Sequence, residues 1–234
     1  MSGLLQGAAG AAAQRVLVVG ASRGIGLELV RQYREAGAAV TATARNDAGL
    51  VSIQALGAQA LRLDVAEPAS ATALRPLMAG LVFDTVLLVA GVYGPRTQGL
   101  ETPEPAEFDA VMHTNVLGVM QVLPQVVDAL APGARLGVIS SRMGSIALRA
   151  SASGWLYRAS KAAVNSVLKD ASLVLAGRAI CVALHPGWVR TEMGGDGADI
   201  SVQTSAADLR RTLAALVAAD NGGFFNHDGQ PLAW

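Results

Sequence analysis

The sequence predicts a single-domain α/β fold in which helices cover both faces of a doubly wound, mostly parallel sheet. Short apolar runs alternate along the chain with stretches of helical periodicity, which is typical of repeated βα units. Most of these runs are nearly continuous in Val, Leu, Ile and Ala, as expected for strands buried on both faces. The chain has 234 residues and no linker between the units, which indicates one domain.

The expected strands are spaced so that a helix fits between each pair, and right-handed crossovers then follow. They lie at 15–20, 38–44, 60–65, 82–90, 134–140 and 179–185. The first helix follows a glycine turn and reads LELVRQYREAG. The longest helix precedes the fifth strand, where apolar residues recur every three or four positions, and Pro124 is expected to kink it.

The composition excludes several functional classes. Lys and Arg number 18, as do Asp and Glu, and no basic run indicates a nucleic-acid surface or a polybasic membrane patch. One cysteine excludes a Cys-rich zinc site, and the three histidines lack metal-ligand spacing. No apolar run reaches the ~18 residues of a membrane span. We therefore expect no metal, no nucleic-acid partner and no membrane partner.

Residues 1–14 are expected to form a flexible N-terminal tail, and residues 15–234 the folded domain. No Lys or Arg precedes Arg15, and Gly and Gln interrupt the apolar residues, so the features of a signal peptide are missing. We expect a cytoplasmic protein in which Cys181 stays reduced.

The first expected strand ends in the glycine turn Gly20-Ala21-Ser22-Arg23-Gly24-Ile25-Gly26. Glycines allow a sharp turn and the close approach of a ligand. The start of the following helix offers free N–H groups and a positive dipole end to a diphosphate. An ordinary tight turn is the alternative. Its place in the first βα unit favours nucleotide binding.

The second expected strand ends with Arg45, where many dinucleotide sites have an acid for the ribose 2′-hydroxyl. An arginine there favours a 2′-phosphate through charge-assisted hydrogen bonds, and Arg23 is a second candidate contact. The sequence thus favours NADP(H) over NAD(H), the alternative being two solvated arginines. Asp64 is either an acceptor for adenine or an N-cap at the next helix.

Tyr157 and Lys161 stand four residues apart at the start of an expected helix and share one face of it. A tyrosine pKa of about 10 is too high for acid–base work at neutral pH. A neighbouring ammonium lowers that pKa, so the pair is interpreted as a proton donor and acceptor. Pairs of this kind also occur on ordinary surfaces.

Three further features are expected at the same edge of the sheet. Ser140 and Ser141 end the fifth strand, where ligands bind in open α/β sheets. Asn115 lies on the apolar stripe of its helix, so its amide needs partners or a function. The sixth strand ends in Pro186-Gly187, which turns the chain sharply.

Seven motifs therefore occur together in one order: GASRGIG, LDV, AG, NV, SSxxG, YxxxK and PGxVxT. On these the chain resembles the short-chain dehydrogenase/reductase family from about Arg15 to its end. It is similar to the carbonyl-reductase branch that includes C-factor-like signalling proteins, through its ending GGFFNHDGQPLAW and its long interval between serine and tyrosine motifs. The resemblance implies a Rossmann-type sheet of about seven strands.

The resemblance also implies a catalytic tetrad of Asn115, Ser141, Tyr157 and Lys161. Ser141 rather than Ser140 matches, because the family serine stands three residues before a glycine, here Gly144. The implied cofactor contacts are Gly20, Ser22, Arg23, Gly24, Ile25, Gly26, Arg45, Asp64, Val65, Ala90, Gly91, Tyr157, Lys161, Pro186, Gly187, Val189 and Thr191. One departure concerns the family's NNAG motif, which is replaced by Leu88-Val89-Ala90-Gly91, so that both asparagine amides are missing.

The expected function is NADP(H)-dependent reduction of a ketone or aldehyde, with Tyr157 as general acid and Ser141 bonded to the carbonyl. The resemblance assigns to Lys161 the nicotinamide ribose and the lowering of the Tyr157 pKa, and to Asn115 a relay water. The alternative is a cofactor-binding sensing or signalling protein with little catalysis, which the missing asparagines and the chain's ending favour.

Three loops, at 92–99, 142–156 and 188–201, are expected to wall the substrate pocket. They carry Tyr93, Trp155 and Trp188, which favour an apolar or aromatic carbonyl substrate unless they only close the loops over the core. Family members are often dimers or tetramers through the helix that starts at Tyr157, so we expect a homodimer or homotetramer.

Overall fold

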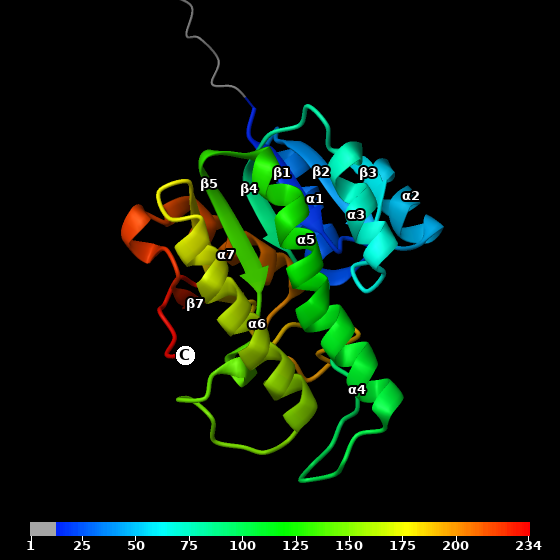
Figure 1. The fold of residues 1–234 in the computed structure, drawn as a ribbon, viewed down its shortest axis with the longest axis vertical. Coiled ribbons are helices and arrows are strands. Elements are labelled where there is room, and N and C mark those ends of the chain that lie inside the picture. The colour runs from blue at the N-terminus through cyan, green and yellow to red at the C-terminus, as the bar shows by residue number, and fades with distance from the viewer. Residues whose placement is uncertain (1–12) are drawn as a thin grey trace, which may run out of the picture.

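A computed structural model describes residues 13–234 and confirms the predicted fold class (Figure 1). All strands of its seven-stranded sheet pair in parallel, in the order β3-β2-β1-β4-β5-β6-β7. The strands are β1 (Arg15–Val19), β2 (Ala39–Ala44), β3 (Gln59–Arg62), β4 (Phe83–Leu88), β5 (Leu130–Ile139), β6 (Ala179–His185) and β7 (Phe224–Asn226). The order reverses between β1 and β4, and the carboxyl ends of strands at such a point form a ligand crevice.

Helices connect the strands and cover both faces of the sheet. They are α1 (Gly24–Glu35), α2 (Asp47–Ala55), α3 (Pro68–Leu77), α4 (Pro105–Met112), α5 (Gly118–Val126), α6 (Trp155–Val174) and α7 (Val202–Ala215). Four short turns complete the set: η1 (His113–Leu117), η2 (Val127–Ala129), η3 (Arg142–Gly144) and η4 (Ala218–Asp220). The buried side chains form two clusters, as a sheet packed on both faces requires.

Each face of the sheet has its own set of covering helices. One cluster joins alternate strand residues such as Leu17 and Leu136 to Leu74 of α3, Val122 of α5 and Leu168 of α6. The other cluster joins residues such as Val18, Leu87 and Leu184 to helices α1, α2 and α7. Neighbouring strand residues point to opposite faces, which explains why the runs read as continuous apolar sequence.

The expected long helix is divided into α4, η1 and α5. The middle piece, η1, is one turn of π-helix and contains the buried Asn115. Such turns are rare and occur often at functional sites. By length and composition, Pro105–Ala129 also meets the requirement for crossing a membrane. In this fold its apolar side is used internally, because Val119, Val122 and Val126 pack in the core.

The strand boundaries differ modestly from those expected. The third strand ends at Arg62, and β5 begins at Leu130, earlier than expected. The seventh strand, β7, has only three residues and no long apolar run. Gln14, assigned to the tail, joins the sheet, because its carbonyl accepts from Ala39 N and its side chain donates to Thr85 Oγ1. Residues 1–12 of the expected tail lie outside the described residues.

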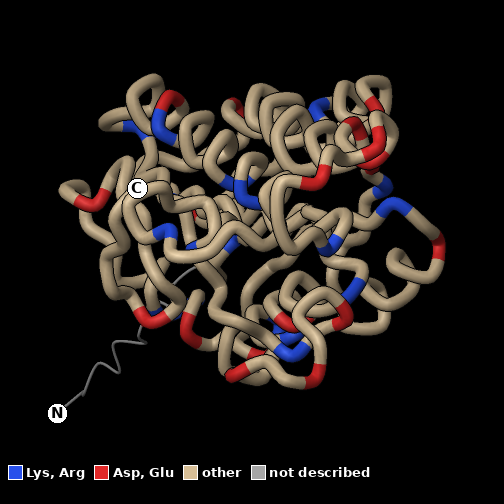
Figure 2. Tube along the Cα trace, turned by 90° about the horizontal axis from the view of Figure 1, so that it is seen from below, with Lys and Arg blue, Asp and Glu red and all other residues tan. Residues whose placement is uncertain are grey.

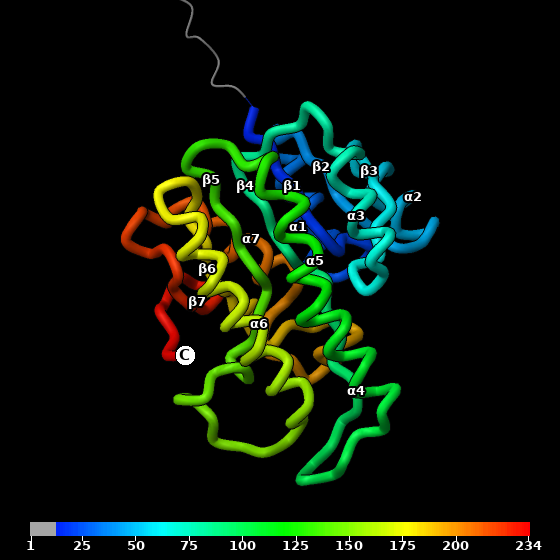
Figure 3. Tube along the Cα trace, viewed as in Figure 1, coloured from blue at the N-terminus to red at the C-terminus, as the bar shows by residue number. Residues whose placement is uncertain are grey.

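The carboxyl ends of the strands lead into long loops. The segments before α4 and before α6 extend beyond the sheet at the lower end of the molecule, where β5 points (Figures 1 and 3). Basic and acidic residues are interspersed along the described chain (Figure 2). The carboxyl edge of the sheet therefore holds the expected site residues, and charges of both signs are mixed along the chain.

Candidate active site

The glycine turn between β1 and α1 closes against the end of β4. Gly20 has a φ of +88°, and a Cβ there would lie 2.6 Å from the backbone nitrogen of Ala90. A Cβ on Gly26 would lie 2.2 Å from the carbonyl oxygen of Gly20. Both positions therefore require glycine, which brings three backbone segments together at the carboxyl edge of the sheet.

The first turn of α1 keeps its amides available. Its N-cap residue, Arg23, makes no capping hydrogen bond, and the turn contains no acidic side chain. Uncapped amides and the positive end of the helix dipole bind phosphates. Ser22 and Ile25 lie partly exposed in the same turn. This turn therefore fits the diphosphate of a dinucleotide.

Arg45 is exposed directly after β2, as a 2′-phosphate contact requires. The nearby acid, Asp47, forms an ion pair with Arg62, which also donates to the Arg45 carbonyl oxygen at 3.0 Å. Asp47 is thus already engaged with a cation. With Asp47 engaged, the exposed Arg45 guanidinium is able to pair with an anionic ligand group.

Arg23, the second candidate contact of the 2′-phosphate, lies in the glycine turn. Its guanidinium forms an ion pair with Glu192, in the segment after β6. The two side chains are 70% and 74% exposed, and exposed pairs of this kind contribute little stability. The pair nevertheless connects the glycine turn to the segment that follows Thr191.

Asp64 stabilises the turn after β3. Its Oδ1 accepts a hydrogen bond from Ala66 N at 3.0 Å, and its backbone N–H donates to Ser70 Oγ. The N-cap of α3 is Glu67, so Asp64 itself is not the cap. Within residues 13–234 its second carboxylate oxygen makes no hydrogen bond, which leaves an acceptor at the crevice edge.

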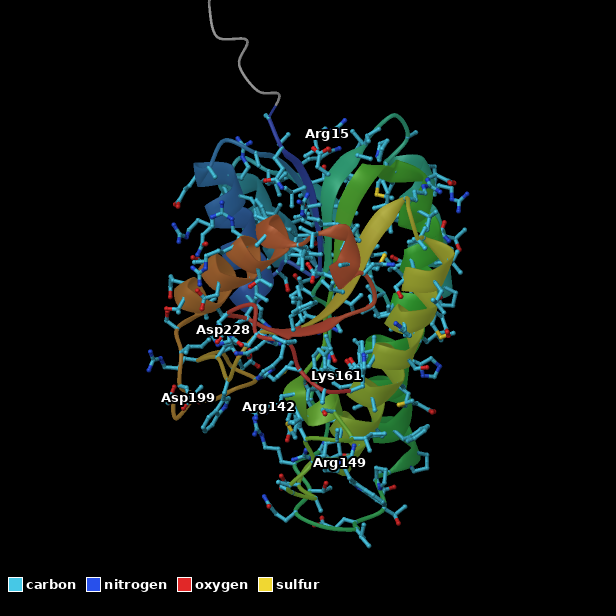
Figure 4. All side chains as sticks on the ribbon, turned by 90° about the vertical axis from the view of Figure 1, so that its left-hand side faces the viewer. Arg15, Arg142, Arg149, Lys161, Asp199 and Asp228 are labelled. Atoms are coloured by element: carbon cyan, nitrogen blue, oxygen red, sulfur yellow. The ribbon has the colours of Figure 1, made fainter. Side chains whose placement is uncertain are left out.

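Tyr157 and Lys161 lie in the first turns of α6, where both are buried. The Lys161 Nζ donates to the carbonyl oxygen of Ile139 at the end of β5, at 2.9 Å. It lies 5.8 Å from the centre of the Tyr157 ring. Figure 4 shows Lys161 and Arg142 in the lower half of the molecule, between Arg15 at the top and Arg149 near the bottom. The pair therefore lies at the carboxyl edge of the sheet.

Burial has the largest effect on the pKa values of both Tyr157 and Lys161. Burial raises the pKa of Tyr157 to about 12, and a side-chain hydrogen bond with Ser141 works in the opposite direction. Burial lowers the pKa of Lys161 to about 8, because a low-dielectric environment disfavours the ammonium. The expected lowering of the Tyr157 pKa by Lys161 does not appear in the protein alone, because burial has the largest effect on that pKa and raises it.

The two serines at the end of β5 have different surroundings. Ser140 is buried and its Oγ donates to Asn165 Oδ1 within α6. Ser141 accepts from Met143 N at 3.1 Å and interacts with Tyr157. Position 144 requires a glycine, because a Cβ there would lie 2.7 Å from the backbone carbonyl carbon of Lys161. The SSxxG pattern thus allows the turn η3 to pack directly on α6.

Asn115 ties three segments together through its amide. Its Nδ2 donates to Val92 O at 2.8 Å and to Ser160 Oγ at 3.0 Å, and its Oδ1 accepts from Val92 N at 2.8 Å. A Cβ on Gly91 would meet both this Oδ1 and the Lys161 Nζ, at 3.3 and 3.4 Å. The structure therefore brings Asn115 beside the lysine, and its amide is satisfied by protein groups.

The segment after β6 turns back to the glycine turn. Gly187 has a φ of +86°, and Ser205 of α7 donates to Pro186 O at 2.6 Å. Val189 is buried, and the Thr191 methyl group would lie 3.5 Å from a Cβ on Gly24. The two ends of the expected cofactor site are thus adjacent in space.

The three expected substrate-pocket aromatics do not gather at one point. Tyr93 stacks on Tyr157 with ring centres 4.5 Å apart. The Arg96 guanidinium lies 4.9 Å from the centre of the Tyr93 ring. Trp155 Nε1 donates to Glu101 O, and Trp188, which is 53% exposed, donates to Gly194 O. Tyr93 thus contacts a candidate catalytic side chain, and each tryptophan bonds a backbone carbonyl of a loop.

Sequence reasoning missed the role of the last residues of the chain. Ser145 Oγ donates to Ala233 O at 2.7 Å, and Ala147 N donates to Trp234 O at 3.0 Å. The Trp234 ring stacks on Phe224 of β7. The chain's ending therefore holds the loop that follows η3. Ser141 stands at the start of η3. No local signal in the sequence pairs these distant segments.

Two of the histidines lie beside the turn after β6, since His185 ends that strand and a Cβ on Gly187 would lie 3.0 Å from the His227 ring. His227 Nδ1 lies 2.7 Å from Asp208 Oδ2. Burial, together with His227 and Arg142, lowers the pKa of His185 to about 4, so that ring is neutral near pH 7. Within residues 13–234, no three His, Cys, Asp or Glu side chains are grouped to hold a metal ion.

Comparison with known proteins gives one consistent family. The family model described as short chain dehydrogenase matches residues 14–199. C-signal of Myxococcus xanthus is 35% identical over 154 residues, which are 64% of this chain and 92% of that protein. A 1-hydroxy-2-glutathionyl-2-methyl-3-butene dehydrogenase of Rhodococcus sp. (strain AD45) is 30% identical over 229 residues, or 94% and 99% of the two chains. A carbonyl reductase of Pseudomonas aeruginosa PAO1 in complex with NADP has a TM-score of 0.83 at 34% identity, covering 95% of this chain and all of that one.

The contact between η3 and α6 predicts the effect of Gly144→Ala. The added methyl group would overlap the Lys161 backbone, which cannot move without displacing α6. We expect a loss of about 1–3 kcal/mol in the free energy of unfolding, measured by urea denaturation. Gly99→Ala is the control, because a Cβ at Gly99 meets nothing within 4 Å. Equal stabilities of the two variants would contradict the packing argument.

Proposed function

Because the chain belongs to the short-chain dehydrogenase family, we propose that it is an NADP(H)-dependent oxidoreductase that reduces a ketone or aldehyde to an alcohol. One observation carries the proposal. The Tyr157 phenol, the Ser141 hydroxyl and the Lys161 ammonium gather at the carboxyl edge, next to the uncapped start of α1. A proton donor beside a dinucleotide-sized cradle is what hydride transfer to a carbonyl requires.

The cofactor, when bound, supplies the hydride. We assign its diphosphate to the turn 20–26 and its 2′-phosphate to Arg45. Asp64 offers its free carboxylate oxygen to the adenine, with Val65 packed below. Ala90, Gly91, Gly187, Val189 and Thr191 border the nicotinamide half, since they lie between the glycine turn and Lys161. The NADP in the Pseudomonas carbonyl reductase supports this choice of dinucleotide.

The residues of α6 and β5 divide the proton chemistry. Tyr157 is protonated at neutral pH because burial raises its pKa, so it holds a proton ready for a carbonyl oxygen. Ser141 donates to that oxygen and stabilises the charge that develops on it. Lys161, fixed by the Ile139 carbonyl, is the charged group nearest to the phenol and the ribose. Asn115 holds the loop at Val92 in place and positions a relay water.

The substrate class follows from Tyr93. Its stacked ring covers one side of Tyr157, so that a carbonyl compound reaching the phenol must pass an aromatic surface. We therefore assign an apolar or aromatic carbonyl substrate, with Trp155 and Trp188 in the loops that border its entry.

A second candidate function is cofactor-dependent signalling with little catalysis. The 35% identity to C-signal supports it, as does the loss of the two asparagines after β4. The two functions differ in one assay, the oxidation of NADPH at 340 nm with a panel of aliphatic and aromatic carbonyls. Binding of NADPH without turnover across the panel would favour signalling.

The proposal also includes a cellular compartment and an oligomeric state. The buried thiol of Cys181 fits the reducing cytoplasm. A homodimer or homotetramer through α6 stays a prediction. It draws support from Leu173 and Val174, which are 65% and 83% exposed on that helix.

Replacement of Tyr157 by Phe removes the proposed proton donor while keeping the stacked ring. We expect kcat for the best carbonyl of the panel to fall by about 10²–10⁴-fold, because general acid catalysis contributes that much. NADPH affinity and the unfolding midpoint should be unchanged. Turnover near that of the wild type would exclude Tyr157 as the acid.

The two serines allow a matched comparison. Ser141→Ala should lower kcat by about 10²-fold or more, because its hydroxyl bonds the phenol, and should also cost about 1 kcal/mol of stability, because that hydroxyl caps η3. Ser140→Ala should lower stability by about 1 kcal/mol while kcat persists, because its hydroxyl bonds to Asn165 in the core. Exchanged results would assign the catalytic hydroxyl to Ser140.

Arg45→Asp tests the dinucleotide preference. The change removes the proposed partner of the 2′-phosphate and introduces a carboxylate that repels it, so kcat/KM for NADPH should fall at least about tenfold relative to NADH. Arg62→Gln, which frees Asp47 instead, is the comparison variant. An unchanged ratio in Arg45→Asp would remove Arg45 from the site.

The buried lysine predicts the pH dependence of reduction. Lys161 loses its charge as pH rises through about 8, whereas Tyr157, with a pKa of about 12, stays protonated. We expect kcat/KM for the carbonyl at saturating NADPH to be level near pH 6–7 and to fall above pH 8. Lys161→Arg should remove the fall, since a guanidinium stays charged. A level wild-type profile up to pH 10 would contradict this role.

A further inference from the structure

A second cavity lies at the amino-terminal edge of the sheet, opposite the candidate active site. Its volume is about 420 Å³, and it is bordered by the starts of β1 and β4, by β5, and by α1 and α7. In Figure 4, Arg15 at the start of β1 lies at the top of the molecule and Lys161 lies in its lower half. The residues lining the cavity are Gln14, Tyr33, Thr85, Arg135, Ala207, Arg210, Arg211, Leu213 and Ala214.

The charges around this cavity are unbalanced. Three arginines line it, and no aspartate or glutamate does. Arg211 is paired with Asp208, but in the described part of the chain Arg135 and Arg210 form no ion pair. Residues 1–13 contain no acidic side chain, so that segment has none to offer. Two guanidinium groups therefore face a cavity without a counter-charge.

The Nε atoms of the same two guanidinium groups are buried and have no hydrogen-bond partner. The Arg210 guanidinium also hydrogen-bonds the Tyr33 side chain. The remaining contacts of the two groups are long: Arg135 Nη2 lies 3.4 Å from the carbonyl oxygens of Ala214 and Leu216, and Arg210 Nη1 lies 3.3 Å from Gln32 Oε1. Buried donors without acceptors are costly, and an arginine donates to a planar oxyanion in two parallel bonds.

The other walls give the cavity its shape. The Arg210 guanidinium lies 4.6 Å from the centre of the buried Tyr33 ring, which fixes its plane. The Gln14 amide donates to Thr85 Oγ1 at 3.0 Å, so the Thr85 hydroxyl proton remains available. Leu213 and Ala214 of α7 provide an apolar side. The cavity thus combines cationic donors with room for a small hydrocarbon group.

We propose that this cavity binds a small organic anion, one that presents a carboxylate or phosphate to Arg135 and Arg210 and an apolar group to α7. The oxyanion accepts from the guanidinium N–H groups that line the cavity and supplies the missing counter-charge. The site is separate from the proposed cofactor site, because it lies at the other edge of the sheet. It therefore stands whether or not the chain proves to be a reductase.

Benzoate and inorganic phosphate are the probes, added separately to the full chain with and without saturating NADP⁺, which occupies the glycine turn. Arginine Nε–H resonances are followed by ¹H–¹⁵N NMR and assigned from the peaks that Arg135→Gln and Arg210→Gln remove. We expect saturable shifts of these two resonances by at least one probe, with a Kd of about 1 mM or below, unchanged by NADP⁺. A response to benzoate alone identifies a carboxylate ligand, and one to phosphate alone a phosphate ligand.

Arg135→Gln and Arg210→Gln should each weaken binding at least about tenfold. Without probe, Arg135→Gln should keep the wild-type unfolding midpoint and amide spectrum, because its charge has no partner in the protein. Arg178→Gln is the control, since Arg178 lies at the same edge and outside the cavity. The proposal is overturned if neither probe gives a saturable shift, or if binding persists in both cavity variants. Arg210→Lys, which keeps the charge without the paired donors, should also bind more weakly if it folds as the wild type does.

Discussion

The burial of Lys161 is the constraint on which the active edge depends. An ammonium removed from water must find compensation, and its one hydrogen bond within the described residues goes to the Ile139 carbonyl at the end of β5. That bond holds α6 against the sheet, and it requires η3 to pass the helix so closely that position 144 has no room for a side chain. Tyr157, one turn earlier, is buried by the same contact. The position of Ser141 follows from it too.

The missing asparagines after β4 are compensated from another direction. The Asn115 amide bonds both ways with the Val92 backbone and reaches Ser160 of α6, so it ties the segment after β4 to the helical layer. The π-turn η1 makes this possible, because it interrupts the α-helical spacing at the one polar residue of an apolar stripe. An irregular turn is thus retained where it satisfies a buried amide.

The sequence predicts the parts of this protein that depend on local chemistry. The doubly wound parallel sheet could be inferred from the βα alternation, and the nucleotide-binding turn from its glycines. The choice of Ser141 over Ser140 came from a resemblance, and its physical reason, the Asn165 bond and the Gly144 contact, needed the packed structure. Contacts between distant segments were not predictable: the Arg23–Glu192 pair, the Tyr93–Tyr157 stack and the bonds of Ala233 and Trp234 to the loop after η3. The three-residue β7 lacked the length that a pattern needs.

The pKa of Tyr157 shows why charge counting in a sequence can give the wrong sign. A lysine four residues away favours the phenolate, but burial disfavours every charged form, and here burial prevails for both groups. The consequence concerns direction. A phenol that keeps its proton can give it to a carbonyl oxygen, whereas taking one from an alcohol first requires an ionised tyrosine. A phenol that is protonated in the protein alone therefore fits the proposed direction, which is reduction. Oxidation would need a further positive charge at the site, such as an oxidised nicotinamide ring, to bring the phenol toward ionisation.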